Sequence, residues 1–453
     1  YATSVDVSLS LPAADTGTGV EKMMVANTSN FSSASWVPYV NTLSWALVSG
    51  DGAKTVYVKY SDRAANVSVI YSDDIILDTT PPQGSIVING GTTYADNTVV
   101  TLALTADDAL SGISQMQFSN DGSNWSSLES FAATKMWTLT TGDGTKTVYV
   151  RYRDNAGNIS SYSDTIILDT TPPSSMVSAL PAYHNVITFT VSWSGSDTIS
   201  GLASYEVQYK DGLTGTWQGW LNGTTLTSAV FNGVNSHTYY FQSRARDTLG
   251  NVELYPGGNG DTYTTIDIAA PTGNIQIENG AAYVSTLSVA LTLSAVDAAS
   301  GVSQMQFSNT GTAFSSWEPF VSTKIWALTS GDGIKTVCVR YRDAAGNISA
   351  VYTDTVALDT TSPTGGIIVA DGAAVVTTTQ IILTLNAVDI NGVSEMRFSG
   401  NGLTWTAWGA FSTNRTWTLP KIPGEYIISV QFRDVAGNES AIYSDSVIYE
   451  FPY

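Results

Sequence analysis

Aspartate is the residue type whose spacing in this sequence points most directly to chemistry. One aspartate recurs at intervals of 92, 93, 96 and 91 residues, at Asp62, Asp154, Asp247, Asp343 and Asp434. Each of these begins a D-x-x-[GA]-N segment. A second aspartate recurs directly before a turn, at Asp15, Asp108, Asp197, Asp297 and Asp389. A third recurs ahead of a proline-containing tract, at Asp78, Asp169, Asp267 and Asp359.

Carboxylates that converge from three loops are a ligand set that Ca²⁺ accepts in its flexible shell. We expect one aspartate of each kind to meet where one repeat is joined to the next. The four predicted sets are Asp78, Asp108 and Asp154, then Asp169, Asp197 and Asp247, then Asp267, Asp297 and Asp343, then Asp359, Asp389 and Asp434. A second interpretation stays open, because aspartate and asparagine also cap tight turns through the backbone. Structural Ca²⁺ is thus one of two explanations, and no other cofactor is required.

Tryptophans form a second recurring group, in the middle of the repeats. The candidates for stacking on sugar rings are Trp125, Trp217, Trp220, Trp405 and Trp408. Packing over the core is the alternative explanation, because large aromatics commonly bury their rings. The sequence contains no nucleophile elbow, phosphate-binding loop or zinc-ligand spacing, and its only histidines are His184 and His237. We therefore expect no enzymatic activity.

The elements that would position these residues follow from internal repetition. The segment MQFSNDGSNW from Met116 returns as MQFSNTGTAF from Met305. Likewise TGDGTKTVYVRYRDNAGNIS from Thr141 returns as SGDGIKTVCVRYRDAAGNIS from Ser330. A fixed period of this length is typical of tandem domains. We expect five domains, over residues 1–82, 83–173, 174–271, 272–363 and 364–453.

Within one repeat the pattern is that of β-strands. Short runs rich in Val, Ile, Thr and Tyr alternate apolar and polar residues, as from Thr147 to Arg153. Turn clusters such as NDGSN and GDGT separate the runs. About seven short strands in some 90 residues is the number expected of an antiparallel two-sheet sandwich. The predicted fold class is therefore all-β, with five sandwiches in an extended rod.

These motifs resemble a known family. ILDTTPP, SGISQMQFSNDG and YRDNAGNIS look like the immunoglobulin-like repeats of large bacterial surface proteins. In the third repeat, VSWSGSD from Val191, SYEVQYKDG from Ser204 and TYYFQSRARDTLGN from Thr238 resemble the fibronectin type III pattern. The resemblance covers the whole chain. It implies an extracellular or cell-surface location, and it is specific for fold rather than for function.

The first repeat departs from the others. Tyr1 aligns with Tyr94 and Gly19 with Gly112, both at an offset of 93 residues. The counterpart of Gly84-Ser-Ile-Val-Ile-Asn-Gly90, a first strand, is therefore missing. Either the sequence is an excerpt, or another copy or protein supplies the strand by β-augmentation. In both cases we expect an unpaired sheet edge.

Composition narrows the functional classes. The formal net charge is −20 and 13% of the residues are charged, so nucleic acid and anionic membranes are poor partners, whereas divalent cations are compatible ones. No apolar run approaches the ~18 residues of a membrane span, so we expect no membrane insertion. Cys338 is the only cysteine, which excludes an internal disulfide.

We expect a structural rod that forms or spaces a surface appendage or filament, with copies of itself or other surface proteins as partners. An adhesin or glycan-binding segment, and a spacer of a larger secreted enzyme, are the alternatives.

Overall fold

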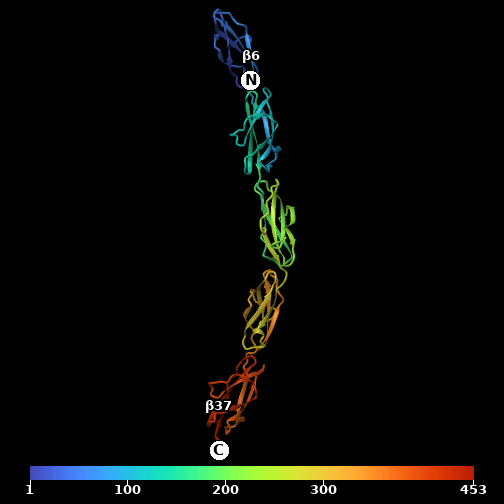
Figure 1. The fold of residues 1–453 in the computed structure, drawn as a ribbon, viewed down its shortest axis with the longest axis vertical. Coiled ribbons are helices and arrows are strands. Elements are labelled where there is room, and N and C mark those ends of the chain that lie inside the picture. Colours follow the sequence, from blue (N-terminus) through green and yellow to red (C-terminus); the bar gives the residue numbers. More distant parts are fainter. Residues whose placement is uncertain (453) are drawn as a thin grey trace.

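The computed structural model describes residues 1–452 and shows five β-sandwich domains in a single line (Figure 1). In Figure 1 the chain runs from the first domain, in blue at the top, to the fifth, in red at the bottom. Each domain passes to the next through a short extended linker, so that consecutive domains meet at their poles. The all-β class and the tandem sandwich arrangement are thereby confirmed.

Domain 2 shows the arrangement most completely. Its elements are β7 (Gln83–Ile88), the 3₁₀ turn η1 (Asn89–Gly91), β8 (Tyr94–Ala95), β9 (Val99–Asp107), β10 (Ile113–Ser119), β11 (Glu129–Ser130), β12 (Thr134–Thr138), β13 (Gly144–Asp154) and β14 (Ile159–Leu168). One sheet has the strand order β12-β9-β7 and the other β11-β10-β13-β14-β8. All pairs are antiparallel except β8 with β14.

The core of domain 2 lies between these two sheets. Along β9, Val100, Leu102 and Leu104 are buried and the residues between them are exposed. This alternation follows from the two-residue period of a strand. Facing them, Val148 and Val150 of β13 are fully buried. The sequence alternation therefore places one apolar face of each sheet inside.

Domains 4 and 5 repeat this topology. Domain 4 consists of β23 (Thr272–Ile277), η2 (Glu278–Gly280), β24 (Tyr283–Val284), β25 (Ser288–Val296), β26 (Val302–Ser308), β27 (Glu318–Pro319), β28 (Thr323–Ala327), β29 (Gly333–Asp343) and β30 (Tyr352–Leu358). Domain 5 consists of β31 (Thr364–Val369), η3 (Ala370–Gly372), β32 (Val375–Val376), β33 (Gln380–Val388), β34 (Val393–Ser399), β35 (Gly409–Ala410), β36 (Asn414–Thr418), β37 (Gly424–Asp434) and β38 (Tyr443–Tyr449). In each, a three-stranded sheet packs on a five-stranded one.

Domain 3 keeps the sandwich but changes its details. Its strands are β15 (Ser174–Val177), β16 (Tyr183–His184), β17 (Thr188–Ser196), β18 (Leu202–Asp211), β19 (Gln218–Thr224), β20 (Ser228–Asn232), β21 (Thr238–Asp247) and β22 (Thr262–Ile266). The strand β19 is longer than its counterparts β11, β27 and β35, and it pairs with β18 through register shifts. Trp193 of β17 is buried at the centre of the core. This domain carries the motifs that resemble fibronectin type III.

Domain 1 lacks one strand, as the sequence offset predicts. It consists of β1 (Asp6–Ser10), β2 (Val20–Ala26), β3 (Val37–Pro38), β4 (Thr42–Ala46), β5 (Gly52–Asp62) and β6 (Tyr71–Leu77). Here β1 pairs with β4 alone, whereas its counterpart β9 is flanked by β12 and β7. The chain starts at the lower end of the domain (Figure 1), where Ala2 bridges to Leu77 in parallel. One edge of β1 is therefore open.

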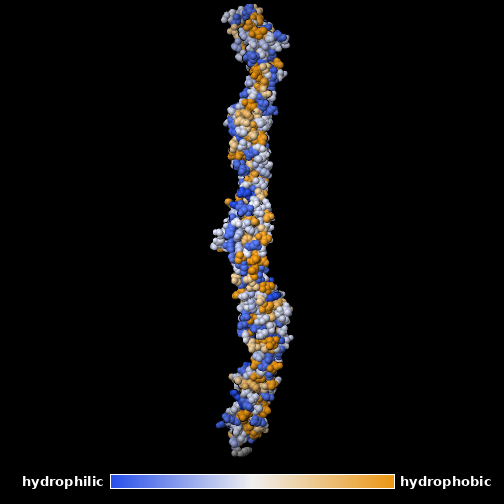
Figure 2. All heavy atoms as spheres, turned by 90° about the vertical axis from the view of Figure 1, so that its right-hand side faces the viewer, coloured by the Kyte–Doolittle hydropathy of each residue, from blue (hydrophilic) through white to orange (hydrophobic). Residues whose placement is uncertain are grey.

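The surface of the rod is chemically mixed. Figure 2 shows small hydrophilic and hydrophobic patches alternating along the visible face from end to end. None of the residues 1–452 forms a helix of the length and hydrophobicity that a bilayer span requires.

Candidate metal centres at the domain junctions

Three aspartates meet where domain 1 is joined to domain 2. Asp78 follows β6 in the linker, Asp108 follows β9, and Asp154 ends β13. One carboxylate oxygen from each lies within 4.8 Å of the others. Asp78 is fully buried and Asp154 is 1% exposed. The pole of domain 2 thus encloses three carboxylates that come from three different loops and two domains.

Turn geometry fixes Asp154. One of its carboxylate oxygens accepts the amides of Gly157 and Asn158, and the other accepts the side-chain amide of Asn158 at 2.9 Å. Gly157 has a φ of 110°, a conformation that glycine adopts at little cost. The D-x-x-G-N spacing is therefore the spacing of a closed turn, and the turn orients the aspartate toward the junction.

Asp108 is fixed in a similar way. Its Oδ1 accepts the backbone amides of Leu110, Ser111 and Gly112, at 3.1, 2.7 and 3.0 Å. Burial by itself would raise the pKa of Asp108, but these amides outweigh it and hold the pKa below its ordinary value. The carboxylate is accordingly anionic at neutral pH. Its second oxygen is not used by the turn.

An asparagine joins the two domains across the cluster. The side-chain amide of Asn158 donates to the backbone carbonyl of Asp78 at 2.9 Å as well as to Asp154. Because Asp78 belongs to the linker, this bond ties the linker to the turn of the next domain. The asparagine of the D-x-x-G-N motif therefore has a role at the junction beyond closing its own turn.

The same arrangement recurs at the other three junctions. The structure brings together the three remaining sets, which are Asp169, Asp197 and Asp247, Asp267, Asp297 and Asp343, and Asp359, Asp389 and Asp434. The matching asparagines Asn251, Asn347 and Asn438 donate to the linker carbonyls of Asp169, Asp267 and Asp359. All twelve predicted aspartates therefore lie in four groups of three, one at each junction.

The carboxylates of these groups are not neutralised by basic side chains. Among residues 1–452, none of the twelve aspartates takes part in an ion pair. Asp78 Oδ2 and Asp389 Oδ2 are buried and have no hydrogen-bond partner. Burying an unpaired carboxylate oxygen is costly, and neighbouring like charges add to the cost. A cation between the three side chains would remove both penalties.

The donor set fits a hard divalent cation. Ca²⁺ binds oxygen ligands at about 2.3–2.6 Å, so two ligands on opposite sides of one ion lie about 5 Å apart. The spread of 4.8 Å within each group is compatible with that limit. Asp108 can cap its turn and bind a cation at the same time. The turn uses only its Oδ1, so that Oδ2 is free to face the junction. Cation binding itself stays a prediction.

The linkers are also held by residues that sequence reasoning missed. Asp143, in the turn before β13, accepts the amide and hydroxyl of Thr170 and the hydroxyl of Thr171. The Thr171 hydroxyl in particular keeps the pKa of Asp143 below its ordinary value. Equivalent clamps form from Asp51 to Thr79 and Thr80, and from Asp332 to Thr360 and Thr361. The sequence feature that could have revealed these clamps is the pairing of each GDG turn with a later DTT tract.

The linker between domains 3 and 4 lacks this clamp. Asp267 is followed by Ile268, Ala269 and Ala270, so no threonine hydroxyl is present. Asn235 Oδ1 accepts the amide of Ile268 at 2.9 Å in its place. This junction therefore keeps its three aspartates but has fewer bonds to the linker.

Most of the candidate sugar-stacking tryptophans face a basic side chain. Arg151 lies over Trp125, Lys210 over Trp217, and Arg397 over both Trp405 and Trp408, at 3.9–5.2 Å from the ring centroids. Trp220 instead packs against the core of domain 3, in edge contacts with Trp193 and Phe231. All five rings are half-buried. Glycan stacking by these residues stays a prediction.

Comparison with known proteins gives likenesses of fold. No protein-family model matches the sequence, and no characterised protein matches it in a sequence comparison. The fibronectin(III)-like modules of Clostridium thermocellum CbhA are 16% identical over 39% of this chain and 94% of theirs, with a TM-score of 0.29. A tetra-tandem repeat from the extending region of a large adhesion protein is 15% identical over 81% and 99%, with a TM-score of 0.26. The FN1–FN3 domains of chicken CNTN1 are 14% identical over 62% and 98%, with a TM-score of 0.28.

These three structures are described as fibronectin(III)-like modules, a tandem repeat and FN1–FN3 domains. Identities of 16% or less concern the fold alone and say nothing about function. By its own strand order, the chain is a tandem array of two-sheet β-sandwiches.

Proposed function

We propose that this chain is a non-enzymatic, extracellular rod that spaces or builds a surface appendage, with divalent cations stiffening its four joints. The observation that carries the proposal is the recurrence of one group of three aspartates at every junction. A feature that serves the array as a whole is expected at each joint, whereas a catalytic site is needed once. The linear shape in Figure 1 supports a spacing role.

The cation would act on the junction by joining two domains through one ion. Asp78 comes from the linker, while Asp108 and Asp154 come from the body of domain 2. Without a cation these carboxylates repel one another, and the linker is tied to domain 2 by Asn158 and by the Tyr162 hydroxyl, which donates to the carbonyl of Pro82. With Ca²⁺ bound, the three loops share one ligand shell, so bending the joint requires breaking it.

Thermal unfolding of the full chain tests this. Ligand that binds only the folded state at 100 times its dissociation constant stabilises by about 2.7 kcal/mol. We therefore expect 1 mM Ca²⁺ to raise the unfolding midpoint by about 5 °C or more over chelator-treated protein. Small-angle scattering should show a longer, stiffer particle with Ca²⁺. An unchanged midpoint would rule out the cation.

Binding stoichiometry supplies the matched control. Isothermal titration should give four sites per chain, one for each group of aspartates. Asp78→Asn should reduce the number to three. Asp62→Asn should leave four, because Asp62 belongs to none of the four groups of aspartates found among residues 1–452. Loss of a site in both variants would contradict the assignment.

A glycan-binding role is a second candidate, and one feature of domain 5 favours it. A surface hollow of about 360 Å³ there is lined by Trp405, Trp417, Asn401 and Thr404 among others. An aromatic ring beside amide and hydroxyl groups is a usual surface for a sugar. Glycan-array binding that Trp405→Ala abolishes would support this role, and an array without signal would remove it.

A further inference from the structure

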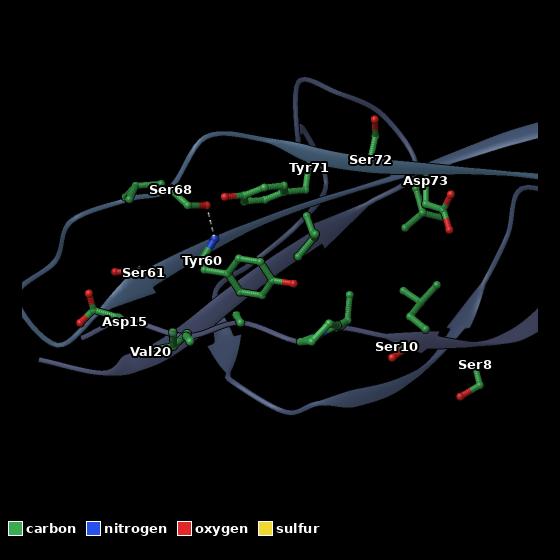
Figure 3. Close-up of a pocket in the computed structure, with 18 of the residues that line it drawn as sticks. Ser8, Ser10, Asp15, Val20, Tyr60, Ser61, Ser68, Tyr71, Ser72 and Asp73 are labelled. Carbon is green, nitrogen blue, oxygen red and sulfur yellow. Dashed lines mark hydrogen bonds between the residues drawn. The ribbon is translucent and has the colours of Figure 1, made fainter. Parts of the chain in front are cut away.

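Two surface hollows of the rod differ in origin. The larger one, in domain 1, has a volume of about 790 Å³, and Figure 3 shows Tyr60, Tyr71 and Asp73 around it. It borders β1 and so belongs to the open sheet edge of that domain. The smaller one, of about 360 Å³, lies in domain 5, whose strand order matches that of domains 2 and 4. An open sheet edge therefore does not explain the hollow in domain 5.

A single residue difference accounts for the hollow in domain 5. In domains 1, 2 and 4 an asparagine directly follows β2, β10 and β26, at Asn27, Asn120 and Asn309. Gly400 holds this place after β34 in domain 5, and it lines the hollow. Trp417, which also lines the hollow, has the same register in its sheet as Trp137 in domain 2. Domain 5 therefore lacks a side chain that three other domains place against this tryptophan.

The asparagine uses both halves of its carboxamide. In domain 2 the Trp137 Nε1–H donates to Asn120 Oδ1 at 2.7 Å, and Asn120 Nδ2 donates to the carbonyl of Thr138 at 3.1 Å. Asn309 makes the same two bonds in domain 4, at 2.7 and 3.0 Å. Asn27 makes them in domain 1, at 2.8 and 3.0 Å. This place in the fold thus accepts a group that carries an acceptor and a donor on one carbon atom.

Domain 5 keeps both partners of that carboxamide. Gly400 offers no acceptor to the Trp417 Nε1–H, and no other side chain among residues 1–452 accepts it. The strand β36 lies at the edge of its sheet, and the amide of Leu419 donates to Thr379 on the β33 side. Because neighbouring residues of a strand direct their backbone groups to opposite sides, the carbonyl of Thr418 faces away from β33. The indole N–H and this carbonyl are therefore both available to a ligand.

The lining of the hollow is neutral. None of its residues, which lie between 398 and 417, carries a charge. Asn401 stands where domain 2 has Asp121, so an amide replaces a carboxylate in this turn. Asn401 Oδ1 accepts the backbone amides of Leu403 and Thr404, and its Nδ2 is left to face a ligand. The hollow therefore suits an uncharged ligand with several hydrogen-bonding groups.

Two common neutral groups match the carboxamide, namely the acetamido group of an N-acetylated sugar and the side chain of a glutamine in a peptide. Next to its amide a sugar carries hydroxyls, which the Asn401 amide and the Thr404 hydroxyl can bind, whereas glutamine carries methylenes. The flat ring of Trp405 lines the same hollow and suits the face of a sugar ring. A volume of about 360 Å³ lies near the lower end of the range for small-ligand pockets, which fits one sugar unit. These features favour the sugar.

We propose that this hollow of domain 5 binds the acetamido group of an N-acetylated sugar. The carbonyl oxygen of that group accepts the Trp417 Nε1–H, and its N–H donates to the carbonyl of Thr418. Asn401 and Thr404 bind hydroxyls of the same sugar. The inference rests on the glycan-binding role proposed for domain 5 and names the group that is recognised, and it is independent of cation binding at the joints.

Calorimetric titration of the full chain with two disaccharides tests the proposal. N,N′-diacetylchitobiose carries acetamido groups where cellobiose carries hydroxyls. A site built to hydrogen-bond one group rejects an analogue that leaves its partners unpaired. We therefore expect the acetylated sugar to bind at one site per chain, about tenfold or more tighter than cellobiose.

Gly400→Asn supplies the carboxamide from the chain itself. A Cβ at Gly400 would lie 3.5 Å from the Trp417 ring, which is an ordinary contact, so the substitution fits. We expect this variant to bind the acetylated sugar about tenfold or more weakly, and hydrogen exchange of the Trp417 indole N–H to slow without any sugar. Gly400→Ala is the matched control. It adds a Cβ but no amide, so it should leave the affinity within about threefold.

The outcomes separate the recognised group from the glycan-binding role. Equal affinity for the two disaccharides would overturn the acetamido assignment and leave a glycan-binding role. Binding of neither disaccharide would overturn both. Tighter binding of the blocked peptide Gly-Gln-Gly than of N,N′-diacetylchitobiose, lost in Gly400→Asn, would show a peptide amide as the ligand instead. Full affinity in Gly400→Asn, despite slowed exchange at Trp417, would place the sugar elsewhere on the chain.

Discussion

The side-chain amide of Asn158 donates a 2.9 Å hydrogen bond to the backbone carbonyl of Asp78, although the two residues belong to consecutive domains. The same amide binds Asp154 within domain 2. One side chain therefore closes a turn and fixes the linker that enters beside it. Because the bond recurs at the three later junctions, each joint is partly ordered before any ion binds.

Loss of this amide should loosen the first junction. Asn158→Ala removes the amide's two bonds, to Asp78 and to Asp154. The bond to the linker is worth about 1 kcal/mol, so protease cutting in the linker at 78–82 should accelerate about fivefold. Asn66→Ala is the matched control, because Asn66 closes the equivalent turn on Asp62 and contacts no linker. Equal acceleration by both variants would show that turn closure, rather than the bridge, protects the linker.

The threonine clamp should make the second linker sensitive to acid. The pKa of Asp143 is lowered in the folded chain, chiefly by the Thr171 hydroxyl. The stabilisation that the Asp143 carboxylate gives to the folded linker is therefore complete above the unfolded pKa of about 3.9. The contribution is lost as the pH falls below that value through the lowered folded pKa. The protection factor of the Thr170 amide, which is the unstructured exchange rate divided by the observed rate at the same pH, should therefore fall more between pH 6 and pH 2.5 in the wild type than in Asp143→Asn. Identical pH profiles would refute the clamp.

Removing the Tyr152 hydroxyl should destabilise domain 2. Tyr152→Phe leaves the carbonyl of Ser85 without its partner, at a cost of about 1–3 kcal/mol. Tyr60→Phe in domain 1 should cost less than about 0.5 kcal/mol, because no strand carbonyl lies there to be orphaned. Urea unfolding monitored by hydrogen exchange in β5 and β13 separates the two domains. Tyr60 pairs with Met23 as Tyr152 pairs with Met116, so a large effect at Tyr60 would show that loss of the bond to Ser85 does not explain the effect at Tyr152.

Gly84 should tolerate no side chain. Gly84→Ala places a Cβ against the carbonyl of Thr105 and the ring of Tyr152, at distances that require the backbone or the ring to move. Overpacking of this kind typically costs about 1–3 kcal/mol. Gly257→Ala is the control, since nothing lies within 4 Å of its added Cβ. Thermal unfolding should therefore shift in the first variant and not in the second.

Bending of the rod should concentrate between domains 3 and 4. That linker lacks the threonine clamp found at the other three junctions, so fewer bonds resist its rotation. Electron microscopy of single rods should give the widest distribution of angles at this joint. Thr170→Val with Thr171→Val should widen the distribution between domains 2 and 3 to match it. Equal angles at all four joints would show that the clamp does not set stiffness.

Much of this could be predicted because the features are repeated. The missing first strand followed from the alignment of Tyr1 with Tyr94, and the groups of aspartates followed from their period. The clamp on Thr170 was missed because Asp143 lies between two glycines in a turn, and its partner lies 27 residues further along the chain. Contacts of that range depend on where the linker passes the pole, which local patterns do not encode.

The tryptophans show a second limit of the sequence. Trp125 and Trp220 both belong to the middle hairpin of their domains, yet Trp125 lies under Arg151 and Trp220 packs against the core of domain 3. The difference arises because β19 extends from Gln218 to Thr224 and carries Trp220 along the sheet, whereas β11 has two residues. Strand length in the middle hairpin, rather than residue type, decides the environment of these rings.

The parallel contact of β8 with β14 has a mechanical consequence. It places Ala95, near the start of domain 2, beside Leu168, near its end, and the same contact recurs in domains 3, 4 and 5. Tension applied to the two ends of such a domain pulls these strands past each other along their length. Their bonds then carry the load together in shear instead of opening one by one like a zipper. A domain closed in this way should therefore resist tension along the axis of the array more strongly than one whose end strands peel apart.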